Sequence, residues 1–526
     1  MAIDAARAAI WGGIQMLPKV LDANPLSQAV LALGEQFCVF RVPFLEANAA
    51  SMAVSVGFAE DQFKCILGFL LAYPLALVFS KLPKGNARHS FSAFFGLFLL
   101  QFIWGAQWIH SFLVLAVSYL LCAALPGKHA PYAVMAFNMV YVATMHTYNM
   151  SSDYMGWRVD ASGPQMVLTI KLTSFAFNYA DGGTPAVLAQ LDAKLAQAEA
   201  ALASPKKPDA RFEKAALRRV KSQRAVALTA LPSPLAFLGY CYSFASLAAG
   251  PSTEMAHYLQ ATELTGPLGA YMAKNGGAHP PRYGRVIFVF VQALGLAGLF
   301  QWGMANYPVQ GIAEPEVLAL PWHLRAGWCW MAMFCSRFKY YFAWKIAEGA
   351  NILAGFGFGG VDDKTGAPDW SGGENIDIVG FETGTSISGV SRAWNLKTQS
   401  WLERYLYARS GGSLVCTYVV SAFWHGVYPG YYLFFLGFAT ATAAQRKLKA
   451  FLEPYAKGLP APLWTGLCMA TTSLVANYLA CAFQLLDLDR TIALWRSFYF
   501  LPHVGLLIAL FALPKQARAK PAAKKE

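Results

Sequence analysis

The sequence predicts an all-α polytopic membrane protein, and three observations lead to this fold class. Hydrophobic residues make up 56% of the 526-residue chain, and the mean hydropathy is +0.37. Charged residues make up only 13%, whereas soluble domains carry about 25%. Apolar stretches recur along the chain, many of them close to the roughly 20 residues that a helix needs to cross a bilayer. A soluble multidomain protein is therefore excluded.

We expect a bundle of about 11 transmembrane helices, one for each apolar run of spanning length. The run 412–444 is long enough for two helices, with a break expected around Gly426 and Pro429. A weaker candidate lies at 27–44. The stretches that we interpret as spans are 62–80, 89–108, 110–124, 131–149, 164–180, 228–249, 284–304, 326–348, 412–444, 463–485 and 491–513.

The net charge of +13 raises the question of a nucleic-acid partner, which the distribution of the charge argues against. The basic residues concentrate in a few hydrophilic segments, as they do on the cytosolic side of membrane proteins. Contact with anionic lipid headgroups is a second role for such segments. The clustered basic residues are Lys206, Lys207, Arg211, Lys214, Arg218, Arg219, Lys221 and Arg224, followed near the end by Lys515, Arg518, Lys520, Lys524 and Lys525.

We expect one transmembrane domain over 1–514 and a basic cytosolic tail over 515–526. Within the domain, the Ala-, Lys- and Glu-rich segment 188–224 predicts a solvated cytosolic hairpin that Pro205 and Pro208 interrupt, and a binding role is the less favoured alternative. The nine cysteines form no CxxC pair, which predicts small core residues. The N-terminal residues lack the pattern of a cleavable signal peptide, so we expect the first transmembrane helix to direct targeting.

The stretch 351–410 is too polar to cross a bilayer as one lipid-facing helix. Irregular backbone at membrane depth is tolerated where protein buries it or where it lines a cavity. We therefore expect short amphipathic or re-entrant helices here. The glycine-rich AGFGFGG at 354–360 does not match a nucleotide-binding P-loop, and a tight turn or a close helix contact is the better interpretation.

Several familiar kinds of active site have no counterpart in this sequence. It has no HExxH motif, no paired Cys or His ligands and no cluster of carboxylates, so we expect no metal site. It also has no GxSxG nucleophile elbow, which argues against a serine hydrolase.

His425 is the most informative residue of the chain. It lies in SAFWHGVYPGYYLFF (421–435), next to Trp424 and within a dense aromatic cluster. A titratable side chain in an apolar stretch is costly unless it has a function or a good partner. Upstream, the polar segment SRAWNLKTQSW carries Asn395. An amide and an imidazole, each beside tryptophans near a membrane, suggest chemistry on a lipid.

Acyl transfer suits this pair of residues. A neutral imidazole can take the proton of an alcohol as the oxygen attacks a thioester carbonyl. An amide side chain can orient the hydroxyl or donate to the developing oxyanion. No covalent enzyme intermediate is needed, which agrees with the missing nucleophile motif. A membrane transporter in which His425 relays protons is the alternative from another class, but no inverted repeat of interrupted helices is evident.

Five segments in order along the chain resemble the membrane-bound O-acyltransferase (MBOAT) family, in particular its lysophospholipid acyltransferase branch. The resemblance covers roughly 130–510. The five segments are QMVLTIKLTSFAFNYADG (165–182), GYCYSFASLAAGPSTEMAHY (239–258), KYYFAWKIAEGANILAGFGFGG (339–360), WNLKTQSWLERYLY (394–407) and SAFWHGVYPGYYLFF (421–435).

This resemblance implies a many-helix bundle around a tunnel, with His425 as the catalytic histidine and Asn395 as the catalytic asparagine. No cofactor is implied beyond acyl-CoA as co-substrate, which would enter from the cytosol, while a lysophospholipid would enter from the bilayer. The resemblance further implies the endoplasmic reticulum membrane. The residues expected to contact substrate in the reaction chamber are Trp394, Lys397, Thr398, Trp401, Trp424 and, as a weaker candidate, Glu382.

The reaction that follows is transfer of a fatty acyl group to the free sn-2 hydroxyl of a lysoglycerophospholipid. The residues of the motifs are similar to those of plant- and yeast-like members of the family, which favours lysophosphatidylcholine and lysophosphatidylethanolamine as acceptors. A sterol, a diacylglycerol or a protein as the acceptor stays open as an alternative. For Lys171, Asn178 and Asp181, two roles stay open: lining the tunnel, or pairing and capping helices.

Overall fold

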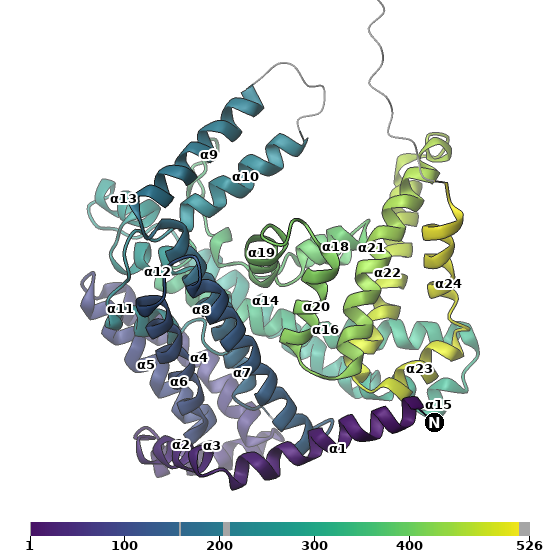
Figure 1. Ribbon diagram of the computed structural model, residues 1–526, viewed down its shortest axis with the longest axis horizontal. Coiled ribbons are helices and arrows are strands. Elements are labelled where there is room, and N and C mark those ends of the chain that lie inside the picture. The colour runs from purple at the N-terminus through teal and green to yellow at the C-terminus, as the bar shows by residue number, and fades with distance from the viewer. Residues whose placement is uncertain (1, 157–158, 204–210, 515–526) are drawn as a thin grey trace, which may run out of the picture. The chain divides into compact units, whose positions relative to one another are not determined.

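The computed structural model describes residues 2–156, 159–203 and 211–514, and they are overwhelmingly α-helical (Figure 1). Among these residues, the sheet structure consists of β1 (Gly360–Val361) paired antiparallel with β2 (Pro368–Asp369). The predicted all-α class is confirmed.

The chain packs into two compact units. The first unit comprises Met1–Ala293, Ala343–Asn375 and Ser400–Arg409. The second unit comprises Leu294–Phe342, Ile376–Gln399 and Ser410–Glu526. One transmembrane domain over 1–514 stays a prediction, and the basic tail 515–526 lies outside the described residues.

The first unit is built mainly from helices that follow one another in the chain. A core of buried aromatic side chains lies between them, in which the ring of Phe79 lies 5.7 Å from that of Phe244 and 5.4 Å from that of Phe356. The helices are α1 (Ala2–Ala23), α2 (Pro25–Gln36), α3 (Pro43–Val56), α4 (Glu60–Lys81), α5 (Asn86–Trp104), α6 (Trp108–Ala124), α7 (Ala130–Ser152), α8 (Ser162–Gly182), α9 (Pro185–Ala203), α10 (Arg211–Val226), α11 (Pro234–Cys241), α12 (Met255–Thr262), α13 (Gly266–Lys274) and the start of α14 (Tyr283–Asn306).

The second unit combines long helices with several short ones. The long α16 runs through the boundary and continues into the first unit. The elements are the end of α14, α15 (Pro315–Leu318), α16 (Trp322–Ala354), α17 (Ile378–Glu382), α18 (Ile387–Ala393), most of α19 (Leu396–Trp401), α20 (Leu414–His425), α21 (Pro429–Ala456), α22 (Ala461–Leu485), α23 (Leu488–Ser497) and α24 (Leu501–Leu507).

Fewer helices than the predicted 11 are both long and apolar enough to span a bilayer. In the described part of the chain these are Glu60–Lys81, Asn86–Ala124, Tyr283–Ala313 and Ala461–Leu485, with the bent pair Leu488–Ser497 and Leu501–Ala512 as a fifth candidate. A multi-pass membrane protein is confirmed, whereas the count of 11 is not. The predicted break in 412–444 is confirmed, because α20 ends at His425 and α21 begins at Pro429.

The prediction of a span at 228–249 was wrong. Helix α11 ends at Cys241, and turns follow it. Tyr240, Tyr242 and Phe244 are nonetheless almost fully buried. The apolar character of this segment therefore reflects burial in the protein core of the first unit, which hydropathy alone does not distinguish from burial in lipid.

The segment predicted as a span at 491–513 is a bent pair of helices and not one straight helix, and the weaker span predicted at 27–44 was wrong. Helices α23 and α24 meet at 85°, because Tyr499 and Phe500 adopt left-handed backbone between them. The segment 27–44 is divided between α2 and α3, since Pro43 begins a new helix after an irregular stretch.

The polar stretch 351–410 folds as predicted into short pieces. The glycine-rich 354–360 forms a turn in which Gly357 has a φ of 82°, and a Cβ there would lie 2.3 Å from the backbone nitrogen of Gly373. The close approach of two backbones explains the glycine. The described residues of 188–224 are also helical and belong to α9 and α10, which lie side by side (Figure 1). The interruption predicted at Pro205 and Pro208 lies outside the described residues.

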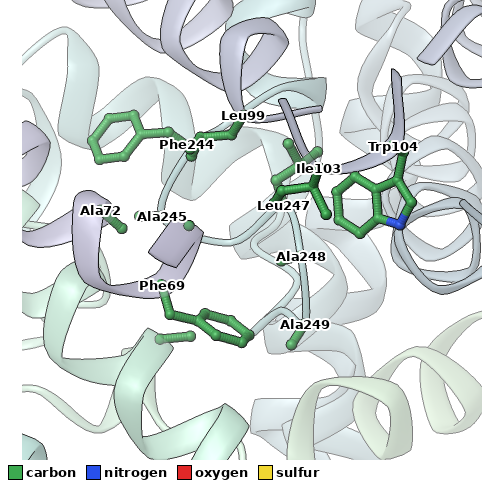
Figure 2. Close-up of a pocket in the computed structure, with 12 residues that line it drawn as sticks. Phe69, Ala72, Leu99, Ile103, Trp104, Phe244, Ala245, Leu247, Ala248 and Ala249 are labelled. Atoms are coloured by element: carbon green, nitrogen blue, oxygen red, sulfur yellow. The ribbon is translucent and has the colours of Figure 1, made fainter. Parts of the chain in front are cut away.

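A small apolar cavity lies inside the first unit between α4, α5 and the segment 244–249 (Figure 2). Phe69, Leu99 and Leu247 are among the side chains that line it. Its volume is about 10 Å³, room for about one water molecule. The cavity is therefore a packing gap and too small for an acyl chain.

Gly96 marks the closest approach of two segments in the first unit. A Cβ at this position would lie 1.6 Å from the carbonyl oxygen of Tyr242. We expect Gly96→Ala to destabilise the protein by about 1–3 kcal/mol, because the backbones must separate. Thermal unfolding of the purified protein would then show a lower Tm than wild type. Gly298→Ala, where a Cβ meets nothing within 4 Å, is the control and should not lower the Tm, because alanine favours a helix more than glycine does. Equal Tm values for both variants would contradict the close packing.

Candidate active site

His425 is the last residue of α20, in the second unit. The helix begins after Ser413, whose Oγ accepts a hydrogen bond from the Cys416 backbone N–H at 3.2 Å. It ends because Gly426 adopts a φ of 140°, a conformation that favours glycine. The imidazole therefore lies at the negative end of the helix dipole, which favours a cation there.

Aromatic rings from α20, α21 and α22 surround the half-buried imidazole of His425. The ring centroids of Trp424, Phe435, Phe483 and Tyr431 lie 4.7, 5.1, 5.1 and 5.7 Å from that of the imidazole. Phe435 stacks on the imidazole, while Phe483 meets it edge-on. The contacts hold the ring plane and shield it from water.

Asn395 lies in the bend between α18 and α19. Its φ of 44° is left-handed, a region that asparagine tolerates better than most residues. Its carbonyl oxygen accepts a hydrogen bond from the backbone N–H of Gln399 at 2.9 Å and so begins α19. The backbone here therefore suits asparagine, and the side chain is half-buried.

Trp394, the residue before Asn395, lies in an aromatic cluster of the second unit. Its ring centroid lies 4.9 Å from that of Phe381, 5.6 Å from Tyr340 and 5.8 Å from Tyr341. Tyr340 and Tyr341 belong to α16, so this packing attaches the segment that carries Asn395 to that long helix.

Glu382 belongs to a buried polar network rather than standing alone. Its carboxylate accepts hydrogen bonds from Arg337 at 3.0 and 2.8 Å and from the Tyr341 hydroxyl at 2.6 Å. Arg337 also donates to Asn477 Oδ1 of α22 at 2.6 Å. The network joins α16, α17 and α22, and Phe483, which contacts His425, lies on the same α22.

The other residues expected to contact substrate divide between the two units. Lys397, Thr398 and Trp424 belong to the second unit with Asn395 and His425. Trp401 belongs to the first unit, where it is 1% exposed and its Nε1 donates to Thr173 Oγ1 at 2.9 Å. The roles of all these residues at a substrate stay predictions.

Three polar residues of α8 pair helices within the first unit. Lys171 Nζ donates to the carbonyl oxygen of Tyr240 at 2.5 Å, and Asn178 donates to Glu254 at 2.7 Å. Asp181 forms a salt bridge with Arg409 at 2.5 Å. Of the two roles left open by the sequence, these contacts support pairing. In the described ranges, no three His, Cys, Asp or Glu side chains gather as a metal site requires.

Sequence reasoning missed Arg337, Tyr341, Asn477 and Phe483. One signal was available, because Arg337 is a charged residue inside the apolar run 326–348, and such residues are usually paired or functional. Its partner could not be inferred, since Glu382 lies 45 positions away in the chain.

We expect Arg337→Ala to destabilise the protein by about 3–5 kcal/mol, because it leaves the Glu382 carboxylate without its buried cation. Arg490→Ala is the matched control in the same unit, since Arg490 pairs with Glu314 at the surface and such pairs contribute about 0–1 kcal/mol. Thermal unfolding of both purified variants would measure the difference. Equal Tm values would show that the Arg337 network does not hold this unit together.

Known proteins with similar sequences identify the family of this chain. The sequence profile of the MBOAT, membrane-bound O-acyltransferase family matches residues 98–479, which include both Asn395 and His425. The chain is 30% identical to a lysophospholipid acyltransferase of Schizosaccharomyces pombe, over 88% of each protein. It is 28% identical to lysophospholipid acyltransferase 1 of Arabidopsis thaliana, over 90% of this chain and 99% of that protein. It is 29% identical to human membrane-bound glycerophospholipid O-acyltransferase 1, over 83% and 84%. The chain belongs to the membrane-bound O-acyltransferase family.

Proposed function

We propose that this protein is a lysophospholipid acyltransferase of phospholipid remodelling. It transfers a fatty acyl group from acyl-CoA to the free sn-2 hydroxyl of a lysoglycerophospholipid, with lysophosphatidylcholine and lysophosphatidylethanolamine as the favoured acceptors. The observation that carries the proposal is the similarity, over nearly the whole chain, to proteins named for this activity in a plant and in fission yeast.

In this proposal His425 is the general base. An imidazole nitrogen takes the proton of the acceptor hydroxyl as its oxygen attacks the thioester carbonyl. The tetrahedral intermediate then collapses, the carbon–sulfur bond breaks, and the imidazolium returns the proton to the departing CoA sulfur. The position of His425 at the end of α20 supports this role, since the helix dipole favours the imidazolium that forms midway.

Asn395 is proposed to orient the hydroxyl or to donate from its amide to the oxyanion. A donor contributes most when it does not have to reorganise as charge develops. The packing of neighbouring Trp394 against α16 supports such a fixed position. Trp394, Lys397, Thr398, Trp424 and Glu382, all of the second unit, are proposed to surround the substrates; Glu382, held by Arg337 and Tyr341, would do so from the wall of the chamber.

The proposed setting is the endoplasmic reticulum membrane, with acyl-CoA arriving from the cytosol and the acceptor from the bilayer. The transmembrane domain would extend over 1–514 and include the hairpin 188–224 as a cytosolic element. Helix α10 is rich in basic residues and pairs with α9, which is consistent with a solvated hairpin of this kind.

We expect purified protein with radiolabelled acyl-CoA to form labelled phospholipid from lysophosphatidylcholine or lysophosphatidylethanolamine. Thin-layer chromatography of the lipid extract would identify the product. Cholesterol, diacylglycerol and a peptide with a free serine are parallel acceptors. Label in one of these and in no phospholipid would overturn the proposed acceptor class, and thioester that stays intact with every acceptor would favour a transporter.

We expect His425→Ala to lower the rate of acyl transfer by about 10²–10⁴-fold, the usual contribution of a general base. The exposed His323→Ala, in the same unit, is the control. Initial rates at saturating substrate would be compared after gel filtration has confirmed folded protein. Full activity in His425→Ala would exclude His425 as the base.

We expect Asn395→Asp to lower the rate by about 10²–10³-fold, because it removes the amide donor. Aspartate also tolerates left-handed backbone, so the bend before α19 should be retained. Asn306→Asp tests the same chemical change at an exposed site of the second unit. A rate close to wild type in Asn395→Asp would leave the amide without a role in the reaction.

A further inference from the structure

A groove with a volume of about 590 Å³ opens on the first unit where α14 begins. One wall is the segment 281–285, and the other is formed by 368–371 with Glu374. Trp370 Nε1 donates to the carbonyl oxygen of Pro281 at 3.1 Å, and Arg285 forms a salt bridge with Glu374 at 2.6 Å. The two walls are therefore held together by direct bonds.

The side chains that line this groove carry equal numbers of positive and negative charges. Arg282 and Arg285 contribute two cations, and Asp369 and Glu374 contribute two carboxylates. Arg285 is shared between Glu374 and the buried Glu348, yet its side chain stays 34% exposed. A formally neutral groove that presents both signs of charge suits a ligand that carries one anion and one cation, and it disfavours a polyanion such as a nucleotide.

Arg282 lines the groove and is almost fully buried. The residue is 5% exposed, and its terminal nitrogens bond to Ser80 Oγ and to His279 Nδ1. In the part of the chain that the structure describes, its Nε has no hydrogen-bond partner. The guanidinium charge of Arg282 nevertheless lies at the wall of the groove and favours an anion there.

The rim of the groove continues into an apolar helix face. Tyr283 stands at the rim and is 59% exposed. Ile287, Phe288 and Val291 follow on α14 at helical spacing and are 62%, 58% and 61% exposed. They belong to the candidate membrane span Tyr283–Ala313, so the groove lies at one end of a span, at the level of lipid headgroups.

We propose that this groove binds the headgroup of a zwitterionic glycerophospholipid from the surrounding bilayer. The phosphate lies against Arg282 and Arg285. The ammonium group lies against Asp369 and Glu374, with the ring of Tyr283 as a cation–π partner. An acyl chain lies along the exposed face of α14. The proposal does not depend on acyl transfer, because it concerns lipid bound at the groove and not lipid consumed.

Photolabelling of the full-length protein tests the proposal. The protein is placed in nanodiscs that contain phosphatidylcholine with a diazirine near the headgroup end of one acyl chain. No acyl donor is added, so labelling is independent of the proposed enzymatic activity. After irradiation, mass spectrometry locates the modified residues, and we expect them within 283–291. Labelling confined to other segments would overturn the proposal.

Gly284 offers a way to fill the groove without a clash. It lines the groove, and a Cβ there meets nothing within 4 Å. We expect Gly284→Trp to lower labelling of 283–291 by about tenfold, which corresponds to the loss of one well-made headgroup contact. Gly298→Trp is the matched control, since it lies on the same helix with the same open space. Equal labelling of the two variants would exclude the groove as the site.

A change of charge gives a second test that does not require filling the groove. Ser371 is exposed and lines the groove, so Ser371→Lys makes it net cationic. We expect labelling by photoreactive phosphatidylglycerol, relative to phosphatidylcholine, to rise about fivefold, as one added cation near anionic lipid would produce. Ala367→Lys, exposed nearby and not lining the groove, should leave the ratio unchanged. The same ratio in both variants would refute headgroup recognition here, even if Gly284→Trp fails to fold.

Discussion

Pairing of charges inside an apolar bundle is the constraint on which the rest of this structure depends. A charged group away from water must find a partner, and each partner connects one helix to another. In the second unit, Arg337 bonds to Glu382 and Asn477 and so joins α16, α17 and α22. In the first unit, Arg404 pairs with Glu254 and Arg409 with Asp181. The polar residues of the bundle thus decide which apolar helices become neighbours.

The candidate active site depends on where helices end. His425 lies at the terminus of α20 because Gly426 adopts backbone that no helix continues, and Asn395 lies in a left-handed bend before α19. Because they lie at helix ends, the side chains of His425 and Asn395 are not confined to the side of a regular helix. Breaks of this kind are tolerated at membrane depth where protein buries the irregular backbone. The aromatic rings around His425 and the packing of Trp394 against α16 bury the irregular backbone at these two sites.

Hydropathy correctly predicted apolar helices of spanning length for some segments and misread others. Residues 284–304 were predicted as a span and lie in α14, which carries exposed apolar side chains along one face. Residues 228–249 are comparably apolar, yet Tyr240 and Phe244 are buried among protein side chains. Lipid and protein interior are both apolar solvents, so composition cannot tell one from the other. Whether an apolar segment lies in lipid or in the protein core depends on which other segments pack against it, and those segments become adjacent only on folding.

The sequence by itself determined the class of the protein and its family. A deficit of charge and repeated apolar runs are properties of composition, and ordered motifs such as WNLKTQSW and SAFWHGVYPG can be identified without coordinates. The break after His425 was also predictable, because Gly426 and Pro429 act locally. Only the tertiary structure decided the contacts between distant residues: Glu382 with Arg337, His425 with Phe483, and the walls of the groove at Arg282. Each joins positions far apart in the chain, and no local rule relates them.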